Sequence, residues 1–127
     1  RRYANYKFQP NAPYTKKVLT TPVGFYNGLT LLPLIAQDQF STMTENAVSP
    51  VGAYDMSGNV FEWVQDWFSD EPLPQPLNKD YQGPKQGKTK IAKGGCYDST
   101  SDGVRSFERI ALDPQHLDQF TGFRVAK

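Results

Sequence analysis

The sequence predicts an α+β domain with little regular secondary structure, in which short strands are joined by long loops. Two observations lead to this expectation. The 127 residues include ten Gly and ten Pro, which favour turns over a helical bundle. Runs of β-branched and aromatic residues are short and are separated by long polar stretches. Because 127 residues suffice for one modest core, we expect residues 1–127 to form a single domain.

Five strand patterns and one long surface loop account for the expected elements, taken in chain order. VLTTPVGFY (18–26) is a short strand pattern that Pro22 interrupts. VFEWVQDWF (60–68) follows a Ser-Gly-Asn turn and mixes apolar and polar residues on both faces, so we expect a strand covered on both sides. Residues 70–90 are polar and rich in Pro and Gly, which predicts a surface loop.

The C-terminal third contains three further strand patterns. IAKGGCYD (91–98) predicts a strand whose two glycines allow a bend. GVRSFERIALDP (103–114) fits either a strand or a single helical turn, and TGFRVAK (121–127) predicts a final strand. We therefore expect short strands, long loops and many aromatic side chains packed in loops.

LTLLPLIA (29–36) is the longest apolar run. It is too short to span a bilayer and is interrupted by Pro33, so no direct membrane span is expected. Two interpretations stay open: packing within the core or a loop, which we favour, and docking against another chain.

The charge balance and the single Cys and His exclude several classes of function. The net charge is +1 and the basic residues are dispersed, so a nucleic-acid partner is not expected. The 127 residues contain one cysteine, Cys96, and one histidine, His116. They cannot form an internal disulfide or a site built from several histidines.

Glu62 poses the main chemical question, because it lies between Phe61 and Trp63 in an apolar segment. A buried carboxylate without a partner costs several kcal/mol or more. Glu62 should therefore bind a metal ion, an arginine or a full set of hydrogen-bond donors. The candidate arginines are Arg105, Arg109 and Arg124.

Five motifs in one order carry a resemblance to a known family: TTPVGFYNG (20–28), SPVGAYDMSGNVFEWVQDWF (49–68), KGGCYD (93–98), VRSFER (104–109) and TGFRV (121–125). Together they resemble the formylglycine-generating enzyme, or sulfatase-modifying factor, domain family. The resemblance implies a variant of the C-type lectin fold that is poor in regular structure. It also implies that this chain corresponds to the C-terminal half of a longer domain.

In the family, the segment matching DMSGNVFEW wraps a calcium ion. The resemblance implies ligands from the carboxylates of Asp55 and Glu62 and the backbone carbonyls of Gly58 and Val60. The chemistry agrees, since calcium takes carboxylate and carbonyl oxygens at flexible geometry. We favour calcium here over an arginine partner for Glu62.

A second calcium site of the family uses a YANI-like stretch and a later Asp. YANY (3–6) supplies Asn5 and Tyr6. Thr15 stands where the family has the Asp, and Lys16 and Lys17 follow it. The missing acid and the two lysines oppose a cation at this second site.

The oxidase members of the family hold copper with a pair of cysteines shortly after their GGS motif. Alignment on Gly94 and Gly95 places Ser99 and Val104 at those two positions, while Cys96 falls on the family's serine. One thiol cannot supply the two soft ligands that Cu(I) needs, so no copper is expected. Iron-dependent relatives need a histidine cluster, which the single His116 cannot supply. The sequence therefore favours a non-catalytic member.

The resemblance implies a groove that binds a peptide or ligand, with walls formed by Cys96, Tyr97, Asp98, Ser99, Arg105 and Arg109. We expect a calcium-stabilised binding or scaffold module that joins a protein partner in an extracytoplasmic complex. Two alternatives remain. One is an oxidase whose other catalytic residues lie on a missing N-terminal part or a partner. The other is a lectin-like receptor with a variable surface at residues 96–120.

Overall fold

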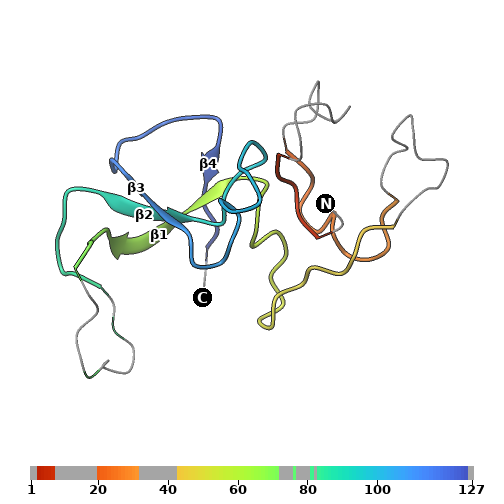
Figure 1. The fold of residues 1–127 in the computed structure, drawn as a ribbon, viewed down its shortest axis with the longest axis horizontal. Coiled ribbons are helices and arrows are strands. Elements are labelled where there is room, and N and C mark those ends of the chain that lie inside the picture. Colours follow the sequence, from red (N-terminus) through yellow and green to blue (C-terminus); the bar gives the residue numbers. More distant parts are fainter. Residues whose placement is uncertain are drawn as a thin grey trace.

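The computed structural model of the chain describes residues 3–7, 20–31, 43–71, 76, 81 and 83–125. Figure 1 shows a small sheet towards one end of the molecule and irregular segments at the other. The irregular end contains residues 3–7 and the two stretches 20–31 and 43–56. Everything in the described part that is regular belongs to the C-terminal half of the chain.

The sheet has four strands: β1 (Phe61–Trp67), β2 (Lys90–Lys93), β3 (Arg109–Leu112) and β4 (Thr121–Gly122). Their order in space is β3-β2-β1-β4. β2 pairs antiparallel with both β1 and β3, whereas β4 pairs parallel with β1. The last strand of the chain therefore lies beside the first, next to the loop that precedes β1.

β2 is the central element of the sheet and is covered on both faces. Ile91 and Ala92 point to opposite faces, and both side chains are buried. β1 pairs with β2 at Trp63↔Ala92 and again at Trp67↔Lys90, with an irregularity between these two pairs. The Lys90 ammonium lies 3.8 Å above the Trp67 ring, so an aromatic ring is covered by a cation rather than by apolar core.

The buried apolar core of the described residues is small. Its members are mostly short side chains: Ala4, Tyr26, Ile91, Ala92 and Cys96. No large side chain in the described part is completely buried. Hydrophobic burial among the described residues is therefore a small stabilising term.

An irregular two-stranded arm extends the N-terminal half. Residues 26–31 and 43–47 run alongside each other through the bridges Asn27↔Asn46 and Leu31↔Met43. The backbone N–H of Ala47 donates to the carbonyl of Tyr26 at 3.0 Å. Leu29 and Leu31 are 79% and 58% exposed, so the start of the apolar run 29–36 is not buried in this chain. Residues 32–36 lie outside the described residues.

The strand that we expected at residues 60–68 is confirmed as β1. Those expected at 91–98 and 121–127 are confirmed only at their starts, because β2 ends at Lys93 and β4 at Gly122; residues 126 and 127 lie outside the described residues. Residues 103–114 form a series of turns and then β3, which settles that alternative in favour of a strand. In the described part of the segment 18–26 the predicted strand is wrong. Gly24 has a φ of +75°, and the Phe25 N–H donates to the Pro22 carbonyl at 3.1 Å, so this stretch turns instead of extending.

No helix in the described part of the chain is long and apolar enough to cross a membrane.

Candidate functional site

The loop from Asp55 to Val60, called the 55–60 loop below, runs directly into β1. Asp55, Gly58 and Asn59 all have positive φ values, of 58°, 75° and 70°. Gly, Asn and Asp are the residues that adopt this left-handed conformation most readily. The sequence Asp-Met-Ser-Gly-Asn therefore folds into a tight turn that exposes its backbone groups to neighbouring segments.

Asn59 connects this loop to three distant parts of the chain. Its side-chain amide accepts from the Thr21 N–H at 2.8 Å and donates to the Thr21 carbonyl at 3.2 Å. Its backbone N–H donates to the Asn5 carbonyl at 2.8 Å, and its carbonyl accepts from the Tyr97 N–H at 2.9 Å. The side chain thus pairs with Thr21 as a strand would, since an amide offers both a donor and an acceptor.

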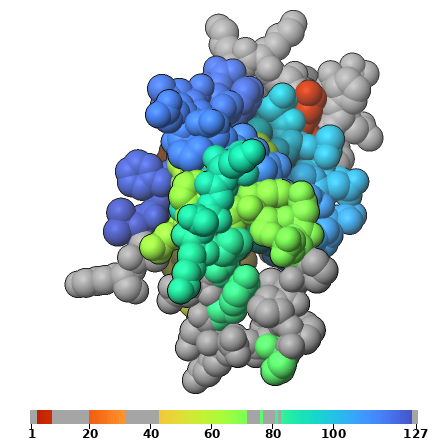
Figure 2. Space-filling view, turned by 90° about the vertical axis from the view of Figure 1, so that its left-hand side faces the viewer, coloured from red at the N-terminus to blue at the C-terminus, as the bar shows by residue number. Residues whose placement is uncertain are grey.

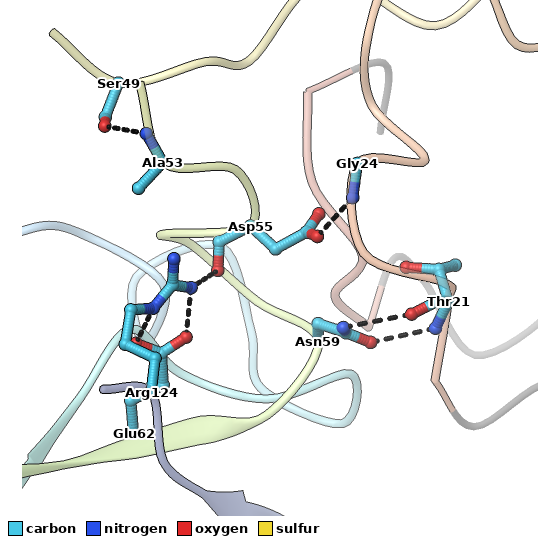
Figure 3. A network of polar contacts seen from close by, with 8 residues as sticks. All are labelled: Thr21, Gly24, Ser49, Ala53, Asp55, Asn59, Glu62 and Arg124. Atoms are coloured by element: carbon cyan, nitrogen blue, oxygen red, sulfur yellow. Dashed lines mark hydrogen bonds and ion pairs between the residues drawn. The ribbon is translucent and has the colours of Figure 1, made fainter. Parts of the chain in front are cut away.

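Asp55 is buried and uses its side chain and its backbone in opposite directions, as Figure 3 shows. Its Oδ2 accepts from the Gly24 N–H at 2.9 Å, while its backbone carbonyl accepts from the Arg124 guanidinium at 3.4 Å. Oδ1 is buried and has no hydrogen-bond partner among the residues that the structure describes. Leaving a buried carboxylate oxygen unpaired is costly, so this atom is a candidate for a ligand.

Glu62, in β1, binds Arg124 as a two-pronged ion pair. The Arg124 Nε donates to Oε2 at 2.6 Å, and the terminal nitrogen donates to Oε1 in a second, shorter contact. Hydrogen bonding to Glu62 raises the pKa of Arg124 further above its usual value, outweighing the effect of partial burial. Of the three arginines that the sequence offered as partners for Glu62, Arg124 is the one that binds it. Its position beside β4 brings it to β1.

The loop offers a hard cation an oxygen ligand at Asp55, whereas the carboxylate of Glu62 already has a partner. Asp55 supplies an unpaired oxygen, and Gly58 and Val60 lie on the same loop. The carbonyls of Met56 and Val60 both lie close to Gly94, where a Cβ would come within 3.3 Å and 4.0 Å of them. The Glu62 carboxylate, in contrast, is held by Arg124. Calcium at this loop stays a prediction, and it would take hard oxygen ligands from these residues.

The first half of the second predicted calcium site packs against the same loop. Asn5 forms a bridge with Gly58, and a Cβ on Gly58 would overlap the Asn5 carbonyl. Asn5 therefore holds the turn from outside through its backbone, and Tyr6 is half-buried beside it. Thr15, Lys16 and Lys17 lie outside the described residues, so a cation at this position stays untested.

The six residues predicted to bind a ligand begin at a sharp turn after β2. Gly94 and Gly95 have φ values of 88° and 72°. Cys96 follows and is buried, with its N–H donating to the Ser99 Oγ at 2.9 Å and its sulfur 3.5 Å from the same oxygen. A Cβ on Gly95 would lie 2.8 Å from the Val104 side chain. Ser99 and Val104 thus both lie close to the Gly95–Cys96 turn.

Tyr97 and Asp98 attach this turn to the rest of the molecule. The Tyr97 ring packs at a tilt against Phe120 with centroids 5.4 Å apart, and its hydroxyl is buried without a hydrogen-bond partner in the described part of the chain. Burial raises the pKa of Tyr97, and the electrostatic effect of its neighbours, among them Asp98, adds to it. Asp98 is exposed and pairs with the Lys7 ammonium at 3.0 Å.

Arg105 and Arg109 face solvent on the same part of the chain. Arg105 pairs with Asp102 at 2.6 Å, one turn earlier. The Arg109 guanidinium lies 4.9 Å from the Phe68 ring centre, and Arg109 is directly opposite Lys93 in the β2–β3 register. Paired residues in antiparallel strands share a face, so two cations lie side by side there. We call Cys96–Ser99, Arg105 and Arg109 the 96–109 surface.

No sequence motif identified Asn59, Thr21 or Lys7 as contact residues, although they hold the loop and the surface together. The signal at Asn59 was present, because a Gly-Asn pair in a tight turn favours left-handed backbone and an amide can pair with a backbone N–H and C=O at once. Nothing in the local sequence identifies Thr21 as its partner, since the two are 38 residues apart.

The Sulfatase-modifying factor enzyme 1-like domain matches residues 2–127. The chain belongs to this family. The match spans all of the described residues, including both the 55–60 loop and the 96–109 surface. It confirms the family resemblance that the five sequence motifs indicated.

Relatives within the sulfatase-modifying factor family carry different names. A serine/threonine-protein kinase pkn1 from Chlamydia pneumoniae is 36% identical over 89 residues, which are 68% of this chain and 14% of that protein. The formylglycine-generating enzyme of Thermomonospora curvata is 34% identical over 93 residues, which are 67% of this chain and 31% of the enzyme. The chain thus spans less than a third of each of these relatives.

A solved structure supports the fold. Treponema denticola variable protein 1 superposes with a TM-score of 0.54 at 30% identity, covering 65% of this chain and 28% of that one. The irregular, loop-rich variant of the C-type lectin fold that the sequence predicted is therefore confirmed.

Proposed function

We propose that the chain is a non-catalytic sulfatase-modifying factor domain that binds a protein partner through the 96–109 surface. The observation that supports the non-catalytic part of this proposal is the set of side chains around Cys96. The single thiol of the 127 residues is buried and lies against the Ser99 hydroxyl. Ser99 and Val104 stand where the oxidase pattern has its two cysteines, and neither side chain is a soft ligand. The residues present do not fit copper.

Copper binding and peptide oxidation test the absence of catalysis. The purified chain is titrated with Cu(I). It is then incubated with a peptide that contains the sequence CxPxR, and the peptide's mass shows whether its cysteine has been converted to formylglycine. We expect no stoichiometric copper and no formylglycine. The double variant Ser99→Cys/Val104→Cys is the matched control, because both positions adjoin the same turn and the variant restores two thiols. Stoichiometric copper and product with the parent chain would favour the oxidase interpretation.

The proposed partner surface combines exposed cations with apolar groups. Arg109 is exposed and stands opposite the half-buried Lys93, which has Glu62 opposite it on β1. The exposed Arg109 would suit an acidic segment of a partner. Phe107, between Arg105 and Arg109, is an exposed apolar residue. Leu29 and Leu31 are exposed apolar residues on another segment. Charged and apolar groups of this kind are typical of protein interfaces.

Co-purification tests the partner directly. Native mass spectrometry of the protein from its own source should show a heavier assembly. Arg109→Ala and Lys93→Ala should weaken the complex without unfolding the chain, since Arg109 is exposed and Lys93 is half-buried. An unchanged complex in the double variant would exclude this surface as the interface.

We further propose that calcium stabilises the 55–60 loop and that the chain works outside the cytoplasm, where calcium is abundant. The buried, unpaired Oδ1 of Asp55 supports a cation at this loop. When bound, calcium would link the Asp55 carboxylate to the loop carbonyls of Gly58 and Val60. Asp55→Asn should weaken calcium binding in a calorimetric titration; equal affinity of parent and variant would exclude Asp55 as a ligand.

A second candidate function is a ligand receptor with a variable surface at residues 96–120. It is favoured by the structural likeness to Treponema denticola variable protein 1, and by the short-range contacts of this stretch. Sequencing related copies from the same source distinguishes the two functions. Copies that differ mainly within residues 96–120 and keep the 55–60 loop unchanged would support the receptor.

A further inference from the structure

Arg124 occupies the position of a cation between two residues of the predicted calcium ligand set. Its guanidinium donates to both carboxylate oxygens of Glu62 and to the backbone carbonyl of Asp55, as Figure 3 shows. One side chain of the chain itself therefore links the acid at the start of the loop to the acid that follows it. The sequence assigned the carboxylates of both acids to a metal ion, and Arg124 binds one of them, that of Glu62, while it reaches Asp55 only at the backbone carbonyl.

We infer that Arg124 competes with calcium for the Glu62 carboxylate, so that this chain contains its own antagonist of the calcium site. The inference depends on the calcium part of the proposed function. In the described structure the arginine holds Glu62, and the loop offers a cation the Asp55 carboxylate and backbone carbonyls. Binding of calcium through Glu62 requires at least one of the two arginine contacts to be given up.

Charge supports the competition. Asp55 and Glu62 together carry two negative charges, and Arg124 lowers this to one. A guanidinium bonded to the Asp55 carbonyl also repels a divalent ion bound at the same residue. Because an arginine stays protonated at every ordinary pH, a change of pH cannot remove this competitor. The site should therefore bind calcium more weakly than its set of oxygen atoms suggests.

Geometry supports it as well. The Asp55 side chain points towards Gly24, whereas the Glu62 side chain points towards Arg124 (Figure 3). The two carboxylates do not face a common point while Arg124 is bound to Glu62. The Arg124 and Glu62 side chains are 35% and 20% exposed, so the pair lies near enough to solvent for Glu62 to change partners.

The test is calcium titration of the parent and three variants, by calorimetry and by thermal unfolding, with CaCl2 and with MgCl2 as the control salt. Arg124→Met keeps the length of the side chain and removes its charge. We expect it to bind calcium about tenfold more tightly or better, because charge-assisted contacts that oppose the ion are lost. Calcium, but not magnesium, should restore the stability that the substitution removes. A merely structural role for Arg124 gives no such rescue.

The double variant Arg124→Met/Glu62→Gln isolates the carboxylate. If the gain passes through Glu62, it disappears in the double variant. Arg124→Lys keeps a positive charge but loses the planar guanidinium, so its calcium affinity should lie between those of the parent and Arg124→Met. This variant replaces Arg124→Met as the test if Arg124→Met does not fold in either salt. If Arg124→Lys binds no more tightly than the parent in that case, the inference is wrong.

The remaining outcomes are separable. A parent and an Arg124→Met variant with equal calcium affinity overturn the competition and leave the calcium site standing. A persistent gain in the double variant overturns the assignment of the effect to Glu62. Absence of binding in all four proteins overturns both the calcium site and the competition, while the proposed partner binding is decided by its own experiment.

Discussion

The 55–60 loop and the stretch from Cys96 to Phe120 are held by contacts of different range. The polar contacts of the loop reach residues that are 31 to 69 positions away, at Gly24, Thr21 and Arg124. Those within the later stretch mostly join residues two or three positions apart, as in Cys96–Ser99, Arg105–Asp102 and His116–Asp118. Figure 2 shows part of that stretch, in blue, lying over one face of the molecule beside the segment that leads into β2.

We therefore regard the 55–60 loop as part of the structural scaffold and the turns of the later stretch as a surface. A loop whose contacts join distant segments cannot change without disturbing several of them at once. A stretch that stabilises itself through short turns can accept substitutions with local consequences. The later stretch is tied to the rest of the molecule mainly by β3, which pairs with β2, and by the Phe120 carbonyl, which accepts from the Phe61 N–H. Outside β3, Tyr97 is joined to Asn59 by backbone, and Lys7 to Ser99 and Asp98. The comparison predicts large stability effects in the loop and small ones in the exposed turns at residues 98–108 and 113–118.

The largest effect is expected at Gly58. Gly58→Ala would place a Cβ against the Asn5 carbonyl at a φ of +75°, so both overlap and backbone strain oppose it. We expect the free energy of unfolding to fall by about 3 kcal/mol or more, measured by urea denaturation. Gly52→Ala is the matched control: its φ is +80° but no atom lies within 4 Å, so only the strain of about 1 kcal/mol remains. Equal losses in the two variants would show that Asn5 does not pack on the loop.

Asn59 should give the next largest effect. Asn59→Ala removes two hydrogen bonds to Thr21 and leaves an alanine at a φ of +70°, for a loss of about 2–4 kcal/mol. Asn59→Gly removes the same hydrogen bonds without the strain, and should lose about 1–2 kcal/mol less. Amide hydrogen exchange should report faster opening at Thr21 in both variants. Unchanged exchange there would mean that the Asn59 amide does not hold the segment.

Sequence patterns found the strands because their signals are local. The aromatic and β-branched run of β1, the glycine pair after β2 and the final TGF segment each identify themselves within a few residues. The segment 18–26 was wrong for the opposite reason. Its composition is that of a strand, but its N–H and C=O groups around Thr21 and Gly24 pair with the side chains of Asn59 and Asp55, contacts that no local pattern contains.

The sequence named the residues of the candidate site, but it did not show which of them contact one another. The motif named Asp55, Gly58, Val60 and Glu62, which lie on one loop and the start of β1, and their role as calcium ligands stays a prediction. Arg124 was named among three arginines for Glu62, and the sequence could not choose between them. The choice follows from the parallel pairing of β4 with β1, which sets Gly122 beside Glu62. A pairing between strands 60 residues apart is a property of the fold and not of either segment.

The 96–109 surface should show a smaller effect than the loop. Arg105 and Asp102 are 56% and 71% exposed at their side chains, and exposed ion pairs contribute little to stability. Arg105→Ala and Asp102→Ala should each change the free energy of unfolding by less than about 0.5 kcal/mol, while any partner that contacts Arg105 should bind the first variant more weakly. A loss comparable with that of Asn59→Ala would mean that this stretch is part of the scaffold and not a free surface.

The smallest expected effect is the pH dependence of the turn before β4. Burial acts to raise the pKa of Asp118, but hydrogen bonds from His116 and from the Phe120 N–H outweigh it, so the pKa lies below its usual value. A carboxyl whose pKa is lowered by folding stabilises the protein above the unfolded pKa, and this stability is lost as the pH falls through the lower, folded pKa. Asp118→Asn should therefore flatten the dependence of the urea midpoint on pH below about pH 4.

His116→Gln supplies the control for this last prediction, since it removes the imidazole from Asp118 and leaves the Phe120 N–H in place. It should remove only part of the pH dependence that Asp118→Asn removes. Because Asp118 touches residues two positions away, neither substitution should alter calcium affinity at the 55–60 loop. A change in calcium affinity in either variant would show that the two regions are coupled, and the separation of scaffold from surface would then be wrong at this turn.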